Sequence, residues 1–259
     1  MNSSLKTALI FGGLLIAVVG AAFLYSRSLE NGAPGPARSD PAAAGAAPAV
    51  DLAPAIGAAV EAARAADYEE ALRLFGTVPP TDPGYVVARR GYGSVQVELG
   101  RPLEAVDTFD ALLAIAPEDA EVRVARSWAL YHLGRYDRAE AETLRALEIA
   151  PQHPGARYNV AFFRIMQGRV AEAIPAYQRA LRNDPEGRHM TRALEDLALV
   201  AQTRPDVHQV HYALAFFANT QGRTDTEVEE LELFLEAVPT GPVAETARQR
   251  LAEASATLQ

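Results

Sequence analysis

Apolar side chains follow two different patterns along this chain. Residues 7–26 carry no charge and are apolar on every side of a helix, between Lys6 and Arg27. At about 1.5 Å per residue, this segment of 20 residues reaches roughly 30 Å, the thickness of a bilayer's hydrocarbon core. From residue 52 onward, apolar residues instead recur three and four positions apart among polar ones, as in amphipathic helices. The pattern predicts one membrane-spanning helix followed by an all-α body.

We interpret residues 1–27 as a transmembrane signal anchor and residues 28–51 as a flexible linker. The linker is rich in Ala and Pro and nearly lacks large apolar side chains, so it cannot bury enough surface to offset its ordering entropy. A cleaved signal peptide is the alternative, because small residues stand at cleavage-like spacing at residues 19–21. The apolar run continues past them, which favours the anchor.

Three residue types recur every 34 positions in the body. Glycine, which tolerates the positive φ needed where a helix ends, recurs at Gly100, Gly134 and Gly168. Alanine, which lets two helices approach closely, recurs at Ala71, Ala105, Ala139 and Ala173. Proline, which ends the second helix of each unit, recurs at Pro83, Pro117, Pro151 and Pro185. An aromatic residue follows the alanine by four positions at Phe75, Phe109 and Tyr177, and Thr143 stands there in the remaining copy.

This pattern resembles the tetratricopeptide repeat (TPR) family, whose unit is a pair of antiparallel helices. The clearest copy is residues 154–187, with Tyr158-Asn159, Ala161, Gln167-Gly168, Glu172-Ala173-Ile174, Tyr177, Ala180-Leu181 and Asp184-Pro185. The resemblance implies an all-α, right-handed TPR-like solenoid over residues 52–259, built from about five helix pairs, one extra helix and a C-terminal capping helix. The pairs are expected at residues 52–85, 86–119, 120–153, 154–187 and 208–241.

Residues 188–207 fall out of phase with the repeat. Ala193, Leu197 and Ala201 stand there at helical spacing, which predicts one helix without a partner. This extra helix either bends the array between the fourth and fifth pairs or is a degenerate repeat absorbed into it. Residues 242–259 predict a capping helix, whose apolar face comprises Ala247, Leu251, Ala254 and Leu258.

Large apolar residues recur along the first helices of the units at spacings of four and three, which places each set on one helix face. They are Val124, Trp128 and Tyr131; Tyr158, Phe162 and Ile165; and Tyr212 and Phe216. In the TPR family the first helices line the concave face that usually binds the partner. The resemblance therefore implies a groove with aromatic anchors, suited to an extended segment or a helix of another protein. Ordinary packing between helices is the alternative, because a rotated first helix would bury these side chains.

Three arginines, Arg89, Arg123 and Arg157, are also 34 residues apart and predict a ladder. Their guanidinium groups either bind carboxylates of a partner, or they pair with acidic neighbours within the chain or snorkel to solvent.

Charge and composition exclude several classes of function. The chain has a net charge of -9 and a pI near 5.1, which argues against nucleic-acid binding. Cysteine is absent, so disulfides and thiolate chemistry are excluded. His208 and His211 form a weak metal pair without an obvious third ligand. Since a phosphate-binding loop and a nucleophile elbow are also missing, the sequence predicts no enzyme, no cofactor and no metal site.

These features predict a membrane-tethered scaffold or assembly factor that binds partner proteins through a concave TPR surface. We expect a single-pass protein of the inner (cytoplasmic) membrane, held by residues 7–26, with the repeat domain in the periplasm or otherwise outside the cytoplasm. Lys6 and Arg27 flank the two ends, so the distribution of positive charge gives only a slight preference for one orientation. The short N-terminal tail is typical of a signal anchor and favours an N-terminus in the cytoplasm. The alternative is a permanent accessory subunit of a large membrane complex, with the span packed against other subunits.

Overall fold

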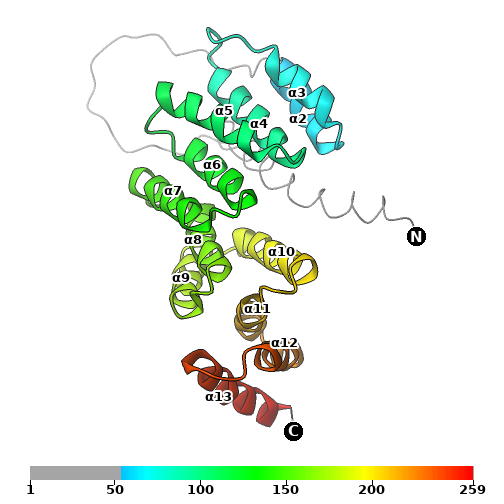
Figure 1. The fold of residues 1–259 in the computed structure, drawn as a ribbon, viewed down its shortest axis with the longest axis vertical. Helices are drawn as coiled ribbons and strands as arrows, with labels where there is room; N and C mark the ends of the chain where they lie inside the picture. The colour runs from blue at the N-terminus through cyan, green and yellow to red at the C-terminus, as the bar shows by residue number, and fades with distance from the viewer. Residues whose placement is uncertain (1–53, 259) are drawn as a thin grey trace. The chain divides into compact units, whose positions relative to one another are not determined.

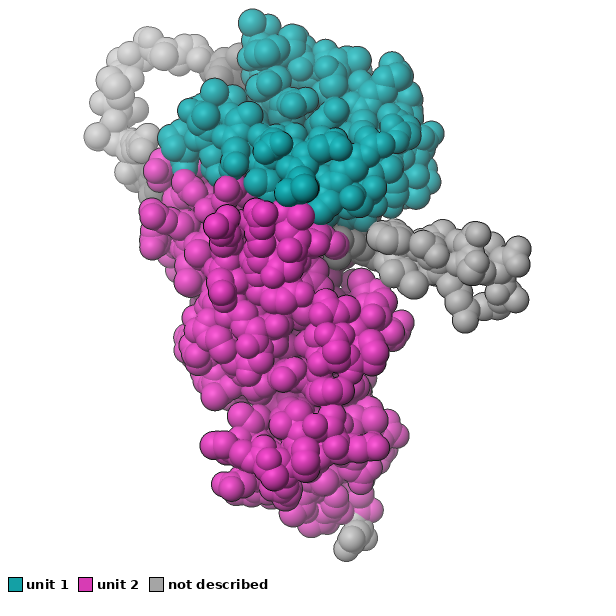
Figure 2. All heavy atoms as spheres, viewed as in Figure 1, with its two compact units in different colours: residues 1–117 teal, residues 118–259 magenta. Residues whose placement is uncertain are grey.

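The structure is a computed structural model and describes residues 54–258. The expected signal anchor and linker lie outside these residues. Within residues 54–258, no helix is both long enough and apolar enough to cross a membrane. The described chain is all α-helical, which confirms the predicted fold class at that level, and it divides into two compact units at Pro117 (Figures 1 and 2).

The first unit contains four described helices that pack in chain order. They are α2 (Pro54–Arg64), α3 (Tyr68–Gly76), α4 (Tyr85–Glu98) and α5 (Pro102–Ile115). Helix α3 packs against both α2 and α4, and α4 packs against α5. Their core comprises aliphatic and aromatic side chains around Ile56, Phe75 and Val95, each of which is almost fully buried.

The second unit contains eight helices within the described residues. They are α6 (Ala120–His132), α7 (Tyr136–Ile149), α8 (Pro154–Met166), α9 (Val170–Arg182), α10 (Arg188–Thr203), α11 (Gln209–Thr220), α12 (Thr224–Ala237) and α13 (Pro242–Thr257). The pairs α6–α7, α8–α9 and α11–α12 form hairpins, α7 also packs against α8, and α13 packs against α12. In the capping helix, Ala247 and Ala254 are buried, but Leu258 follows the last helical residue and is 50% exposed, so its predicted place on the apolar face is wrong.

The recurring small residues hold the hairpins together. Ala71, Ala105, Ala139 and Ala173 are all 0% exposed, which confirms that the 34-residue alanine marks a close helix approach. The Phe109 ring packs directly against Gly93 on the first helix of its pair. A Cβ added to Gly93 would lie 2.7 Å from this ring, so no larger residue fits there. Thr143 fills the aromatic position of its pair, fully buried, and its hydroxyl donates to the Ala139 carbonyl at 2.9 Å.

The turn inside each hairpin requires a left-handed residue. Gly134 and its counterparts Gly100 and Gly168 have φ between 70° and 76°, as predicted for this glycine. In the first hairpin, Ala66 stands 34 residues before Gly100 and adopts φ of 60°. A left-handed conformation costs an L-residue about 1–2 kcal/mol, so this alanine is strained where the other hairpins carry glycine.

Replacing Ala66 by glycine should therefore stabilise the first unit by about 0.5–1 kcal/mol. Two opposing effects set this value. Removing the left-handed strain stabilises the folded state by about 1–2 kcal/mol, and the greater conformational freedom of glycine in the unfolded chain destabilises it by about 0.4–1 kcal/mol. Urea unfolding of the full chain measures the change. The matched control is Ala65→Gly in the same turn, where φ is not positive and a loss of stability is expected. Equal effects of the two substitutions would contradict the assignment of strain.

Helix α10 is the out-of-phase element. It packs against α8 and α11, while α11 also reaches α8 and α9 (Figure 1). The α11–α12 hairpin therefore adjoins the α8–α9 hairpin directly, and α10 lies beside these hairpins instead of forming a layer between them. Helix α11 approaches α9 less extensively than α8 approaches α7, so the junction between these two hairpins is looser.

Candidate functional site

The predicted aromatic stripe forms a continuous cluster where α6 meets α8. The Phe162 ring lies 5.5 Å from that of Trp128 and 5.2 Å from that of Tyr131, measured between centroids, and Phe163 joins both. The Trp128–Phe163 and Tyr131–Phe162 pairs meet edge-on, and such contacts stabilise aromatic pairs beyond the burial of their area. With the Asn159 amide turned so that its oxygen accepts, the Trp128 indole N–H donates to it at 3.1 Å.

The structure divides the eight groove candidates by exposure. Three on α8 are buried: Tyr158 and Phe162 are each 3% exposed, and Ile165 is 0% exposed. The other five are partly exposed: Val124, Trp128, Tyr131, Tyr212 and Phe216. The stripe is thus packed inside on α8 and reaches solvent on α6 and α11.

A network at the start of α10 explains the burial of Tyr158. The Asp184 carboxylate accepts the Tyr158 hydroxyl at 3.1 Å and the backbone N–H groups of His189 and Met190 at 2.9 and 3.0 Å. These N–H groups belong to the first turn of α10, whose own N-cap is Gly187, without a side chain to cap it. Asp184 therefore fastens the start of α10 to α8.

A buried carboxylate lies in the middle of α10. Asp196 is 8% exposed and pairs with Arg192 of the same helix, with 3.3 Å between Oδ1 and Nε. Burial raises the pKa of Asp196 to about 6, against the lowering effect of Arg192. Burial also raises the pKa of Tyr131 and of Tyr177, and the nearby Asp196 adds to both shifts. The carboxylate of α10 therefore lies close to aromatic residues of α6 and α9.

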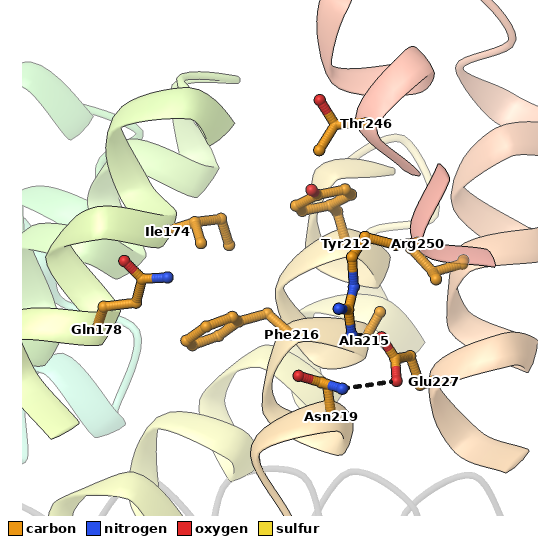
Figure 3. A pocket seen from close by; sticks show the side chains of 10 residues that line it. Ile174, Gln178, Tyr212, Ala215, Phe216, Asn219, Glu227, Thr246 and Arg250 are labelled. Atoms are coloured by element: carbon orange, nitrogen blue, oxygen red, sulfur yellow. Dashed lines mark hydrogen bonds and ion pairs between the residues drawn. The ribbon is translucent and has the colours of Figure 1, made fainter. Parts of the chain in front are cut away.

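The partly exposed aromatics of α11 line a cavity of about 320 Å³ between α9, α11, α12 and α13. Figure 3 shows Ile174 of α9 and Phe216 of α11 projecting into it from opposite sides, with Tyr212 beside them. A polar wall faces these residues: the Arg250 guanidinium lies 2.5 Å from Glu227, and the Asn219 amide donates to Glu227 at 3.0 Å. The cavity is therefore lined by apolar side chains on one side and by polar side chains, which bond to one another, on the other. Ligand-binding clefts commonly combine these two kinds of lining.

The three ladder arginines have different local partners in the structure. Arg89 lies over the Tyr92 ring, 4.5 Å from its centroid. Arg123 pairs with Glu142 at 3.2 Å, and Arg157 donates to the Pro151 carbonyl at 2.6 Å. Of these three contacts, only that of Arg123 is the pairing with an acidic neighbour that the alternative predicts.

A buried charge network between α7 and α8 had no signal in the sequence. Glu140 is 6% exposed and accepts from Arg164 at 2.7 Å, Gln167 at 3.1 Å and Arg169 at 2.7 Å. Arg169 also pairs with Glu172 at 2.5 Å. Hydrogen bonding to these two carboxylates raises the pKa of Arg169. In the sequence, a glutamate within an amphipathic helix looks like a solvent-exposed residue. Glu140 becomes buried and joins the network only because α8 packs against α7.

Of the two histidines in the predicted weak metal pair, His211 contacts a carboxylate of α12. His211 Nδ1 lies 2.8 Å from Glu230, and His208 precedes the first residue of α11. Residues 54–258 contain no group of three or more His, Asp or Glu side chains arranged to hold a metal ion.

Successive helical hairpins with a left-handed turn residue, a buried alanine and a partly exposed aromatic face define a helical-repeat protein. Models of the tetratricopeptide repeat match residues 56–120, 91–154, 124–188 and 164–242. The chain therefore belongs to the tetratricopeptide repeat family. TPR proteins generally mediate protein–protein interactions and are typically non-enzymatic scaffolds.

The chain is similar to solved structures at low sequence identity. The chain is similar to a thermophilic TPR protein of Thermus thermophilus, with 19% identity, a TM-score of 0.50 and coverage of 78% of this chain and 98% of that one. It is also similar to MamA of Desulfovibrio magneticus, with 17% identity, a TM-score of 0.46 and coverage of 53% of this chain and 78% of that one. No curated protein matches the sequence significantly.

Proposed function

We propose that this protein is a membrane-tethered scaffold or assembly factor that binds partner proteins through its TPR domain, without chemistry of its own. The observation that carries this proposal is the cavity lined by Tyr212 and Phe216. Both side chains are partly exposed, and aromatic anchors in a cleft with a polar edge are typical of the centres of protein interfaces. Membership of the TPR family supports the same class of function.

The tether rests on the sequence of residues 7–26. Their length and the absence of charge match a single span, and Lys6 and Arg27 mark its ends. We infer that the span lies in the inner membrane and that the repeat domain lies in the periplasm.

Affinity recovery of the full chain from solubilised membranes, followed by mass spectrometry, tests the proposal. The control is a chain limited to residues 1–53, which keeps the proposed anchor and lacks the repeats. We expect specific proteins with the full chain and not with the control, and we expect a chain that starts at residue 52 to leave the membrane fraction. Equal recovery with the full chain and the control would contradict binding through the repeats.

A permanent accessory subunit of a membrane complex is the second candidate function. Small residues in the proposed span, Gly12, Gly13 and Gly20, would permit close contact with other helices. Native-size analysis after stringent washing separates the two functions, because a permanent subunit co-migrates with its complex at a fixed ratio and a scaffold does not.

A further inference from the structure

We propose that the cavity between α9, α11, α12 and α13 takes a basic peptide segment with an apolar anchor. One apolar side chain of the segment inserts between Ile174, Tyr212 and Phe216, and neighbouring Lys or Arg side chains meet the carboxylates at the α12–α13 side of the cavity. The inference rests on the proposed function, because it names the chemistry of the partner that occupies the same cavity.

The size and lining of the cavity call for an inserted side chain. Its volume is about 320 Å³, and an apolar cavity of about 150 Å³ is already large enough to hold benzene. Ile174, Tyr212 and Phe216 form its apolar side, and all three are partly exposed (Figure 3). One or two large apolar side chains would remove these surfaces from water, whereas a whole helix would not fit.

Two amide side chains beside the apolar lining suit a peptide backbone. Gln178 and Asn219 line the cavity near Phe216, and both are exposed (Figure 3). The Asn219 N–H donates to Glu227, which leaves its carbonyl oxygen as an acceptor. An amide offers both a donor and an acceptor, which match the C=O and N–H groups of an extended segment. These groups favour a peptide over a purely apolar ligand.

The α12–α13 side of the cavity carries an excess of negative charge. Helix α12 contains six carboxylates and no basic residue. Arg250 lines the cavity, but two carboxylates share it: Glu227 lies 2.5 Å away and Glu253 lies 3.3 Å away. Glu253 follows Thr246 by seven residues and Arg250 by three, which places it on the cavity face of α13. Its side chain is 53% exposed and therefore accessible to a partner.

This charge distribution favours a basic occupant and also orients it. Complementary charge attracts a basic segment and repels an acidic one, and Arg250 offers an acidic segment little because Glu227 and Glu253 already compensate it. The α9 side is less acidic, since Arg182 stands one turn beyond Gln178. The basic side chains of the occupant would therefore point toward α13, with the apolar anchor between α9 and α11.

Three short synthetic peptides test the inference on the full-length protein. The first alternates lysine and serine around a central phenylalanine, the second has glutamate in place of every lysine, and the third has serine in place of the phenylalanine. Each carries a fluorescent label, and anisotropy measures its dissociation constant. We expect the first peptide to bind about tenfold or more tightly than either of the others. Its affinity should fall several-fold as the salt concentration rises from about 50 to about 200 mM.

Substitutions locate the binding of the first peptide. Tyr212→Ala/Phe216→Ala should weaken it about tenfold or more, and Glu253→Lys should weaken it about fivefold. The matched control is Glu148→Lys, which makes the same change of net charge at an exposed position of α7 and should alter the dissociation constant less than about twofold. Circular dichroism of each variant verifies that it is folded.

The outcomes separate failure of the inference from failure of the proposed function. Equal or tighter binding of the glutamate peptide, still dependent on Tyr212 and Phe216, overturns a basic partner and leaves the cavity as a binding site. Binding of the first peptide that is unchanged in Tyr212→Ala/Phe216→Ala, or equally weakened by Glu253→Lys and Glu148→Lys, shows attraction by net charge alone and overturns the inference. Absence of binding by the first peptide also overturns it, while recovery of partners from membranes tests the scaffold function separately.

Discussion

Replacing Phe162 by alanine is expected to lower the free energy of unfolding by about 3–4 kcal/mol. The side chain is 3% exposed and lies among the rings of Trp128, Tyr131 and Phe163, so its removal leaves a cavity in a well-packed cluster. Truncation of a buried phenylalanine costs about 3–5 kcal/mol when the surroundings cannot collapse. Urea unfolding monitored by the fluorescence of Trp128, the only tryptophan, measures the loss directly.

The matched control is Phe216→Ala, which removes the same side chain from the corresponding position of α11. Phe216 is partly exposed at the cavity between α9 and α11, so we expect a loss of only about 1 kcal/mol. Similar losses of unfolding free energy for the two substitutions would contradict this account, because they would mean that the aromatic residues of α8 and α11 are equally well packed.

Replacing Glu140 by glutamine is expected to destabilise the second unit by about 2–4 kcal/mol. The carboxylate is buried between α7 and α8 and satisfies both Arg164 and Arg169, with side chains 16% and 39% exposed. Neutralising one member of a buried charge network leaves its partners without compensation, which costs about 3–5 kcal/mol in full burial and less here because Arg169 reaches solvent.

Glu172→Gln is the matched control for Glu140. Glu172 also pairs with Arg169, but its side chain is 53% exposed, and exposed ion pairs contribute little to stability. Thermal unfolding of both variants in low and high salt should show a large, weakly salt-dependent loss for Glu140→Gln and a small, screened one for Glu172→Gln. A loss for Glu140→Gln no greater than that of the control would contradict a structural role for the network.

Much of the fold could be predicted because the repeat restricts each position physically. A glycine such as Gly134 marks a left-handed turn, and an alanine such as Ala139 marks a helix contact that admits no larger side chain. These local requirements recur every 34 residues, so they identify the helix pairs without knowledge of distant contacts.

The candidate site could be predicted only in part, because exposure depends on contacts between distant segments. Phe162 and Phe216 occupy equivalent places in the repeat, and nothing in their spacing separates them. In the structure Phe162 packs against the rings of Trp128, Tyr131 and Phe163, whereas Phe216 lines a cavity. Glu140 was missed for the same reason, since its arginine partners lie 24 and 29 residues away.

The central claim is that partner binding depends on the cavity between α9 and α11. Its most direct test is the dissociation constant, measured by calorimetry, between the full-length protein and the partner recovered with it. Wild type, Tyr212→Ala/Phe216→Ala and the control Leu144→Ala, which removes an apolar side chain that is 40% exposed on α7, should be compared. We predict that the double substitution raises Kd about 100-fold and that Leu144→Ala leaves it unchanged. Equal Kd values for all three proteins would contradict the claim.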